Sequence, residues 1–365
     1  MTDFQQDIKR RNLPPILPEG MTAEKWPSYR QELIDLFCRE EYGFSPPAPK
    51  EVRAKVLSDD PIAWAGKAHH RQVSLSFDTP KGEFAFPVDI VLPKSERTPP
   101  IIVYISFTPY PCGKYGPIEE LVEQGYGLAI FDSNSITLDG DDNFTGGIAA
   151  MYDRTSDDGT IWGKISMWAW GASRVMDYLQ TLREADKNRI YVVGHSRLGK
   201  TALWCAAQDL RFAGAGVNNS GCSGMAVTRG KRGERVADIV HVFPYWFCKN
   251  YHKYVNREDE MPFEQSMLAA LIAPRLLAVS NAEEDIWADP ISEYMSLVEA
   301  DKAYQLLGVP GLVAPLDCFP DVGTKFDKGR IAYNLRSGTH FMSRHDWLFY
   351  MDYFETQGVR QYETC

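Results

Sequence analysis

The chain has 365 residues, a formal net charge of −10, and apolar and aromatic fractions of 44% and 12%. This composition is typical of a globular protein large enough to bury a substantial core. The acidic balance gives neither a basic patch for nucleic acid nor a cationic face for a membrane surface, so both kinds of partner are excluded.

Signals for cellular compartment are weak in this sequence. Met1 is followed by polar residues without the apolar stretch of a secretory signal, and no run of 18 apolar residues predicts a transmembrane helix. The seven cysteines are scattered and lack metal-site spacing, so we expect reduced thiols. They are Cys38, Cys112, Cys205, Cys222, Cys248, Cys318 and Cys365. We expect a cytoplasmic protein, with a secreted or periplasmic enzyme that has lost its signal as the alternative.

The first 50 residues predict an amino-terminal arm followed by a helix. Residues 1–22 are polar and proline-rich, which is typical of an arm lying on the surface. Apolar residues then recur at steps of three and four between Trp26 and Phe37, which predicts a helix ending near Gly43. Three extended segments follow, at residues 52–57, 70–77 and 86–92. The second of them alternates apolar and polar residues, as in a half-buried antiparallel strand.

Beyond these segments, short apolar strands alternate with helical stretches. The predicted strands are residues 101–105, 128–131, 190–193, 212–217, 276–279 and 331–335, and the helices residues 118–123 and 164–184. Strands separated by helices imply a mainly parallel sheet covered on both faces. Residues 132–162 and 221–265 are predicted to be surface excursions. We therefore expect one domain over residues 1–365, with a catalytic core from residue 51 onward.

Ser196 lies at a predicted sharp turn between a strand and a helix, in the sequence R-I-Y-V-V-G-H-S-R-L-G-K. Gly194 and Gly199 flank it, so the backbone can take the strained geometry that exposes a serine hydroxyl. The usual motif for this turn is G-x-S-x-G, whereas here Leu198 stands two residues after the serine. Ser196 is therefore a candidate nucleophile, and an ordinary strand-to-helix turn is the alternative.

The string G-H-S-R-L-G-K resembles the G-x-S-R-x-G-K signature of the glucuronoyl esterases, carbohydrate esterase family 15, whose bacterial members carry this histidine before the serine. Further similar stretches are A-W-G-A-S-R-V-M-D-Y around Trp170, F-P-Y-W-F-C around Trp246, and M-L-A-A-L-I-A-P-R. The resemblance extends from about Ile101 to the carboxyl terminus. It implies an α/β-hydrolase fold, a three-layer αβα sandwich with a mainly parallel sheet, extended here by an amino-terminal helix and antiparallel strands.

A serine nucleophile needs a histidine base that is held in one tautomer by a carboxylate. In α/β-hydrolases the acid and then the histidine follow the serine, each in a loop after a strand. Only His340 and His345 come late enough in the chain. His340 follows the loop signal S-G-T, whereas His345 lies at a predicted helix start, so His340 is the favoured base and His345 the alternative.

The acid is predicted in the loop S-N-A-E-E-D-I-W-A-D-P, which follows the strand at residues 276–279. Four carboxylates crowd this loop: Glu283, Glu284, Asp285 and Asp289. Bacterial glucuronoyl esterases show a similar E-E-D-x-W-A-D-P stretch, and this resemblance favours Asp285. Many family members instead carry a catalytic glutamate just after the strand that follows the nucleophile. Asn219 stands there in this chain, and an amide cannot stabilise an imidazolium as a carboxylate does.

The oxyanion of an ester-cleavage intermediate needs hydrogen-bond donors. Arg197 directly follows the nucleophile, so its backbone N–H is placed to donate. The resemblance implies that its guanidinium helps as well. A second N–H should come from the loop S-F-T-P-Y-P after the strand at residues 101–105, through either Phe107 or Thr108.

The resemblance also implies substrate contacts, in which Lys200, Glu234 and Trp287 meet the hydroxyls of a glucuronoyl ring. The alternative interpretations are a surface lysine, half of a surface salt bridge and a core tryptophan, and without the resemblance they would be preferred for Glu234 and Trp287. The implied activity is hydrolysis of esters of glucuronoyl or 4-O-methyl-glucuronoyl residues, as in lignin–carbohydrate linkages, without metal or cofactor. The alternatives are an acetyl or other small carbohydrate esterase and, less favoured, a glycan-binding protein with a decayed triad. The sequence predicts no oligomeric state.

Overall fold

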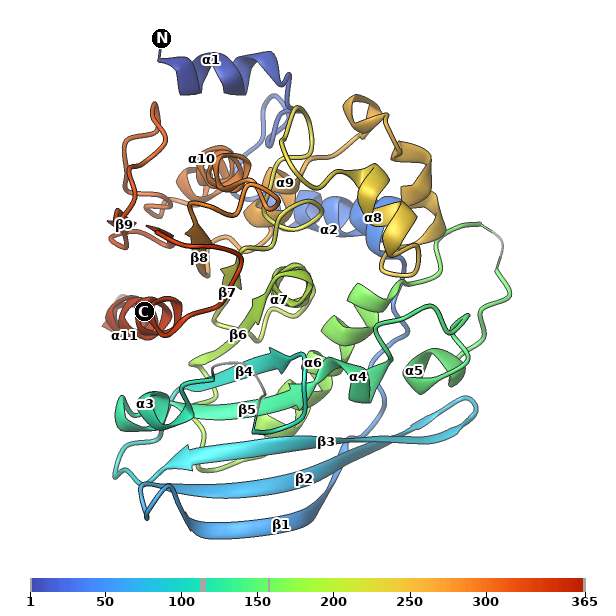
Figure 1. The fold of residues 1–365 in the computed structure, drawn as a ribbon, viewed down its shortest axis with the longest axis vertical. Helices are drawn as coiled ribbons and strands as arrows, with labels where there is room; N and C mark the ends of the chain where they lie inside the picture. The colour runs from blue at the N-terminus through green and yellow to red at the C-terminus, as the bar shows by residue number, and fades with distance from the viewer. Residues whose placement is uncertain (1, 112–115, 157, 364–365) are drawn as a thin grey trace.

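Ten strands form one sheet in the computed structural model, which describes residues 2–111, 116–156 and 158–363 (Figure 1). The strands are β1 (Arg53–Ala63), β2 (Ala68–Thr79), β3 (Gly82–Pro93), β4 (Ile101–Ser106), β5 (Gly127–Asp132), β6 (Ile190–His195), β7 (Gly214–Asn218), β8 (Leu276–Ala282), β9 (Lys325–Phe326) and β10 (Ile331–Arg336). Their order across the sheet is β1-β2-β3-β5-β4-β6-β7-β8-β10-β9. The run from β5 to β10 is parallel, while β1 to β3 and β9 add antiparallel strands at the two edges.

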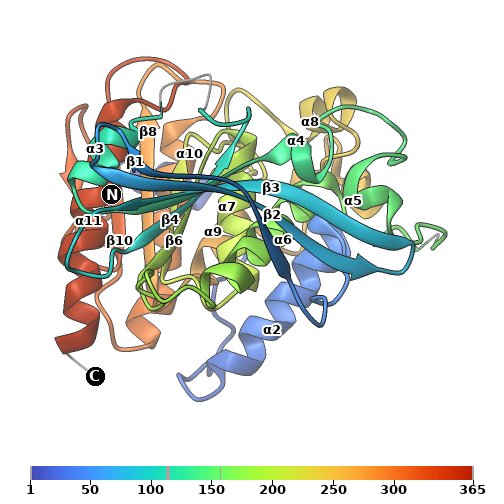
Figure 2. The same ribbon diagram turned by 90° about the horizontal axis from the view of Figure 1, so that it is seen from below.

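Helices connect the strands and cover both faces of the sheet (Figures 1 and 2). They are α1 (Asp3–Arg10), α2 (Trp26–Phe37), α3 (Ile118–Glu123), α4 (Ser133–Ile136), α5 (Gly147–Ala150), α6 (Lys164–Leu179), α7 (Arg197–Gln208), α8 (Val236–Val242), α9 (Gln265–Ala270), α10 (Pro290–Leu306) and α11 (Arg344–Glu363), with a π-helix η1 (Cys38–Tyr42) and two 3₁₀-helices, η2 (Lys249–Tyr254) and η3 (Glu258–Glu260). The parallel sheet between two helical layers confirms the predicted α/β-hydrolase architecture.

Alternate side chains of each central strand pack against different helical layers, because successive side chains of a strand point to opposite faces. In β6, Ile190 and Val192 join the larger buried cluster, which also holds residues of α2, α6, α7, α9 and α10. Tyr191 and Val193 join the second cluster, with residues of α3 and α11. All four of these β6 side chains are fully buried. The centre of the sheet is thus held rigidly from both sides.

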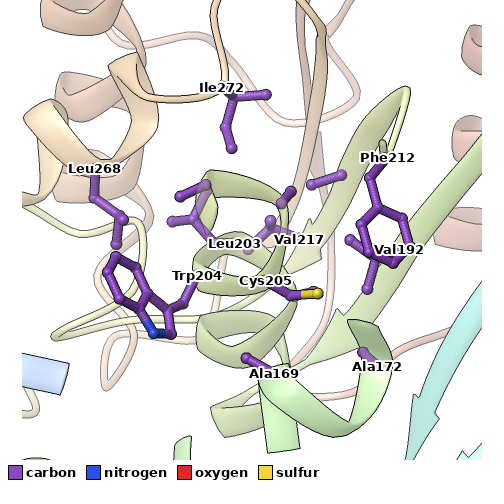
Figure 3. Close-up of a cluster of buried hydrophobic side chains, with 14 of the residues drawn as sticks. Ala169, Ala172, Val192, Leu203, Trp204, Cys205, Phe212, Val217, Leu268 and Ile272 are labelled. Atoms are coloured by element: carbon purple, nitrogen blue, oxygen red, sulfur yellow. The ribbon is translucent and has the colours of Figure 1, made fainter. Parts of the chain in front are cut away.

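Helix α7, which begins directly after Ser196, is buried along almost its whole length. Leu203 and Trp204 are fully buried, and Figure 3 shows them among side chains of β6, β7, α6 and the segment around Leu268. The Trp204 ring stacks on Tyr42 of η1, with centroids 4.2 Å apart. Large buried aromatics contribute heavily to core stability. This packing fixes the start of α7, and therefore the position of Ser196.

The amino-terminal region differs in part from the prediction. The helix at α2 is confirmed and continues as η1 up to Tyr42. Residues 1–22, predicted to be a surface arm, contain α1 and contribute to the core: Phe4 packs against Tyr294, with centroids 5.7 Å apart, and Ile16 is 1% exposed. The helix escaped prediction because its eight residues contain only two large apolar side chains, too few for a visible periodicity.

Both predicted excursions are also more buried than expected. Ile136 and Ile148, within residues 132–162, are at most 1% exposed, and Ile136 packs where Gly171 of α6 leaves space for it. Within residues 221–265, Cys222, Tyr251 and Phe263 are fully buried. The prediction that these parts lie on the surface was wrong. Their apolar residues are scattered without periodicity, so the sequence does not show that they pack against helices.

Two further observations concern membranes and thiols. None of the helices in the described ranges combines the length and the apolar character needed to cross a membrane. Five of the cysteines are described, and none of these five forms a disulfide: Cys38, Cys205, Cys222 and Cys248 are buried and Cys318 is exposed. Cys112 and Cys365 lie outside the described residues.

Candidate active site

Ser196 lies at the turn between β6 and α7 with φ 57° and ψ −130°, a backbone conformation that non-glycine residues rarely adopt. Hydrogen bonds hold the turn on both sides. Its backbone N–H donates to the carbonyl of Asn218 at 2.9 Å, and its carbonyl accepts from Gly199 and Lys200 at 2.8 and 3.1 Å. The strain is therefore carried by the serine itself and offset by its neighbours.

Close approach requires glycine at position 194 and leaves little room for a side chain at Gly199. A Cβ atom on Gly194 would lie 2.0 Å from the carbonyl oxygen of Leu198, and one on Gly199 would lie 3.2 Å from that of Asn218. Leu198 occupies the position of the usual second glycine and is fully buried. The shifted motif G-x-S-x-x-G thus satisfies the same turn, with the second close approach moved one residue along.

His340 brings Ser196 and Asp285 into one hydrogen-bonded chain. Its Nε2 atom lies 2.9 Å from Ser196 Oγ, and its Nδ1 atom lies 2.6 Å from Asp285 Oδ2. The Asp285 side chain is 2% exposed, whereas that of His340 is 40% exposed. The alternative base, His345, lies on α11, 3.3 Å from Asn334 Oδ1. The geometry therefore brings together the three residues predicted as a triad.

Asn219 directly follows β7, as the sequence predicts, and its side chain is tied to the neighbouring strand β8. Its Oδ1 atom accepts from the backbone N–H of Ala282 at 2.9 Å and from Asn281 Nδ2 at 3.3 Å. The residue is 1% exposed and has φ 43°. The amide thus joins β7 to β8 next to the loop that carries Asp285.

Glu293 of α10 is a second buried carboxyl beside the site. It accepts from the backbone N–H of Gly221 at 2.5 Å and from Asn281 Nδ2 at 2.8 Å. Burial, with a smaller contribution from the nearby charge of Asp285, raises the pKa of Glu293 to about 7. Sequence reasoning missed this residue, because a glutamate in the first turn of a helix is ordinarily interpreted as solvent-exposed.

His195 and Asn218, the last residues of β6 and β7, lie behind the base. His195 Nδ1 is 2.6 Å from Asn218 Oδ1, and the His195 and His340 rings are 4.6 Å apart. His195 and Asn218 are both buried. The histidine before the serine therefore packs against the proposed base, a contact that its sequence position alone did not indicate.

The guanidinium of Arg197 lies beside the site in an ion pair with Asp139, with 2.5 Å between Nε and Oδ2. It also lies over the ring of Phe107, 4.5 Å from the centroid. Of the two candidates for the second oxyanion donor, Thr108 donates its N–H to Ser106 Oγ at 3.3 Å. Sequence reasoning missed Asp139 because residues 132–162 were expected to lie on the surface, away from the site.

The three residues expected to contact substrate lie close together. Lys200 Nζ donates to the carbonyl of Ser220 at 2.6 Å and to Glu234 Oε2 at 3.1 Å, and both charged side chains are buried. Glu234 N donates to the carbonyl of Trp287 at 3.0 Å. Trp287 is 55% exposed, so the interpretation as a core tryptophan was wrong, as was that of Lys200 as a surface lysine.

Lys231 supports this group of three and had no distinguishing sequence signal. Its Nζ atom donates to the carbonyls of Arg232 and Trp287, at 2.6 and 3.3 Å, and to that of Glu234. Burial lowers the pKa of the Lys231 ammonium. The lysine thereby ties the Glu234 loop to the Trp287 loop.

Comparison with known proteins identifies the family of this chain. A family model described as "Glucuronyl esterase, fungi" matches residues 76–308, which include Ser196, Asp285 and the Lys200 group. The chain belongs to the glucuronoyl esterase family. Its resemblance to carbohydrate esterase family 15, seen first in the G-H-S-R-L-G-K motif, is thereby confirmed.

Individual glucuronoyl esterases and a related esterase show how far the similarity extends. Carbohydrate esterase MZ0003, of an unknown prokaryotic organism, is 42% identical over 240 residues, which cover 65% of this chain and 54% of that protein. A 4-O-methyl-glucuronoyl methylesterase of Podospora anserina is 28% identical over 296 residues, 78% of this chain and 56% of that protein. The chain thus spans about half the length of these curated relatives. The solved structure of a glucuronoyl esterase from Solibacter usitatus superposes with a TM-score of 0.87 at 32% identity, covering 94% of this chain and 97% of that one.

Proposed function

We propose that this protein is a serine carboxylester hydrolase acting on esters formed by the carboxyl group of a glucuronoyl or 4-O-methyl-glucuronoyl residue. The observation that carries the proposal is the hydrogen-bonded chain from Ser196 Oγ through His340 to Asp285. A serine, an imidazole and a buried carboxylate in this order form the constellation of acyl-transfer hydrolases. Family membership supports the choice of ester, because relatives carry the name 4-O-methyl-glucuronoyl methylesterase.

The reaction follows from the geometry in two half-reactions. His340 Nε2 takes the proton of Ser196 Oγ as that oxygen bonds to the ester carbon, and the carbonyl oxygen becomes an oxyanion facing Arg197. The bond to the alcohol oxygen then breaks, and the alcohol leaves with the proton from His340. Water attacks the acyl-enzyme with His340 again as base, which frees the acid and returns the proton to Ser196. Asp285 holds the imidazole in one tautomer throughout.

Recognition of the sugar would fall to the Lys200, Glu234 and Trp287 group. The substrate is neutral at its esterified carboxyl, so the lysine would act as a hydrogen-bond donor to a ring hydroxyl and the glutamate as an acceptor. Trp287, with its exposed ring, offers an apolar face for the sugar. Lys200 and Glu234 already pair with each other, which keeps their side chains oriented before the substrate binds.

The proposal is tested by kcat/KM on benzyl glucuronate, methyl glucuronate, methyl galacturonate and p-nitrophenyl acetate. We expect the two glucuronates to be preferred. Ser196→Ala should lower their turnover by at least about a thousandfold. Ser58→Ala, on the exposed strand β1, is the matched control and should retain full activity. Undiminished turnover by Ser196→Ala would overturn the assignment of the nucleophile.

Hydrolysis of acetyl or other small carbohydrate esters is the second candidate function. The relative with 42% identity is named only as a carbohydrate esterase, which favours an ester of a sugar without specifying its acyl group. Turnover of p-nitrophenyl acetate or acetylated xylan well above that of glucuronates would favour this candidate. Binding of a glucuronoyl oligosaccharide without turnover, and without labelling of Ser196 by a fluorophosphonate, would instead indicate a glycan-binding protein.

A further inference from the structure

Arg197 is held by side chains from three separate segments of the chain. Asp139 pairs with its Nε atom at 2.5 Å, the Phe107 ring lies 4.5 Å from its guanidinium carbon, and the Trp246 ring lies 6.0 Å from it on another side. The Arg197 side chain is only 30% exposed and that of Asp139 only 12%. An arginine next to the nucleophile is therefore fixed in one orientation instead of moving in solvent.

Asp139 is itself anchored at several atoms. Its Oδ1 atom accepts from Trp246 Nε1 at 2.8 Å, which leaves Oδ2 for Arg197. Its backbone N–H donates to Asn134 Oδ1 at 2.9 Å. The carboxylate thus bridges the guanidinium and the indole that flank the site, and neither oxygen lacks a partner.

A buried lysine fixes the segment that carries Asp139. The side chain of Lys164, at the start of α6, is fully buried, and its ammonium donates to the carbonyls of Leu138 and Gly140 at 2.7 and 2.6 Å. These carbonyls belong to the two residues on either side of Asp139. The same ammonium donates to Asp142 Oδ1 at 2.7 Å. A buried charge with three acceptors is well satisfied, so it can hold this loop in one conformation.

We propose that Asp139 is a positioning residue for the oxyanion site, which holds the Arg197 guanidinium towards the reacting ester. This inference rests on the proposed function, in which Arg197 faces the oxyanion. The contact of Asp139 with the guanidinium is an ion pair at Nε, the nitrogen nearest the chain. An arginine side chain loses considerable rotamer freedom when it is ordered. Because Asp139 orders the Arg197 side chain before the ester binds, no further rotamer freedom need be lost in the transition state.

The test is a double-mutant cycle of Asp139→Asn and Arg197→Ala, measured as kcat and KM on benzyl glucuronate. Asp139→Asn alone should lower kcat about tenfold with KM changed less than twofold, because the oxyanion exists only after the substrate is bound. In the Arg197→Ala background the same substitution should have almost no further effect, because the group that it positions is gone. A tenfold loss in both backgrounds would mean that Asp139 acts independently of Arg197 and would overturn the proposal, as would an unchanged kcat in Asp139→Asn.

Asp141→Asn is the matched control, since Asp141 lies two residues away in the same segment with an exposed side chain. It should leave both kinetic parameters unchanged. Thermal unfolding of each variant shows whether it remains folded. Trp246→Phe is a milder second variant that removes the indole N–H from Asp139 and keeps an aromatic ring. It should lower kcat by a smaller factor in the presence of Arg197, and an unchanged kcat would count against the proposal.

The same cycle on p-nitrophenyl acetate separates this inference from the choice of substrate. Every ester forms an oxyanion, so the coupling between Asp139 and Arg197 should appear with the acetate even if glucuronates are not turned over. The rate at which a fluorophosphonate labels Ser196 gives a third readout, because that reaction also develops negative charge on an oxygen facing Arg197. Coupling with acetate but no turnover of glucuronates would contradict the proposed substrate and support the role of Asp139. Additive effects of the two substitutions in all three assays would contradict the role of Asp139 and would leave the proposed substrate unaffected.

Discussion

The bond of 2.6 Å between His340 Nδ1 and Asp285 Oδ2 joins two loops that are themselves fastened together along their backbones. Strands β8 and β10 are parallel neighbours, and their pairing continues past the sheet. Glu283 N–H donates to the carbonyl of Arg336 at 2.8 Å, and Glu284 N–H donates to that of Gly338 at 3.0 Å. The imidazole and its carboxylate are therefore oriented before any substrate binds.

Replacing Asp285 by asparagine should lower kcat on the preferred ester by a factor on the order of 10³ to 10⁴, because an amide can hold the wrong tautomer of His340. Glu284→Gln, one residue away and exposed, is the control and should retain nearly full activity. Steady-state kinetics at neutral pH decides the matter. Equal rates for Asp285→Asn and the wild type would show that another carboxylate serves the imidazole.

Gly194→Ala should prevent the chain from forming its turn at Ser196. The new Cβ atom would lie 2.0 Å from the Leu198 carbonyl oxygen, a backbone atom that cannot move without shifting the start of α7. We expect little soluble folded protein, or a folded variant that a fluorophosphonate does not label. Gly140→Ala provides the comparison, since its Cβ atom would make only an ordinary contact of 3.6 Å with a side chain. A Gly194→Ala variant that folds and labels normally would contradict this account of the turn.

Asn219→Ala should destabilise the protein by about 1 to 3 kcal/mol, because it leaves the buried N–H of Ala282 without its acceptor. Urea unfolding followed by intrinsic tryptophan fluorescence measures the change. Asn188→Ala is the control, as that side chain is exposed and its loss should change the unfolding free energy by less than about 0.5 kcal/mol. Equal stabilities for the two variants would mean that the Asn219 amide does not join β7 to β8 as described.

Glu293 should make the protein less stable as the pH rises from about 4.5 to about 7. Burial raises its pKa from 4.5 to about 7, so the folded state keeps a proton that the unfolded chain releases. The stabilisation is complete below the unfolded pKa and is lost as the pH passes through the folded pKa. The loss amounts to about 3 kcal/mol at most. Glu293→Gln imitates the protonated acid and should remove this part of the pH dependence.

Unfolding in urea at a series of pH values between 4.5 and 8 compares Glu293→Gln with the wild type. Glu299→Gln, on the same helix and paired with Lys302, should keep the wild-type dependence. If the plots of unfolding free energy against pH for the wild type and Glu293→Gln stay parallel across this range, Glu293 does not titrate as proposed.

The central strands and the triad were predictable from the sequence for a simple physical reason. Buried parallel strands appear as short apolar runs, and the carboxyl ends of such strands meet at one edge of the sheet. Ser196, Asp285 and His340 each follow such a strand, so strand positions alone bring them close. The predicted range of β4 differs from the structure by one residue, and that of β10 also by one.

Other parts of the site could not be predicted, because they depend on contacts between distant segments without periodic patterns. Lys164 fixes the loop that carries Asp139 although 25 positions of sequence separate the two residues. Nothing in the sequence near Lys164 shows that this lysine is buried. Glu293 resembles any acidic residue in the first turn of a helix, where it is normally solvated. Only tertiary packing shows that it faces the end of β7.

The adjacency of β7 and β8 bears on how such an enzyme changes by descent. Asn218 and Ser280 are paired across these strands, so the chain emerges from both strands at the same level. A carboxylate on either loop starts close to the same imidazole. On the proposed assignment, a lineage could gain an acid after one strand before losing the one after the other and remain active throughout. The acid is therefore a member of the triad that two neighbouring loops can supply.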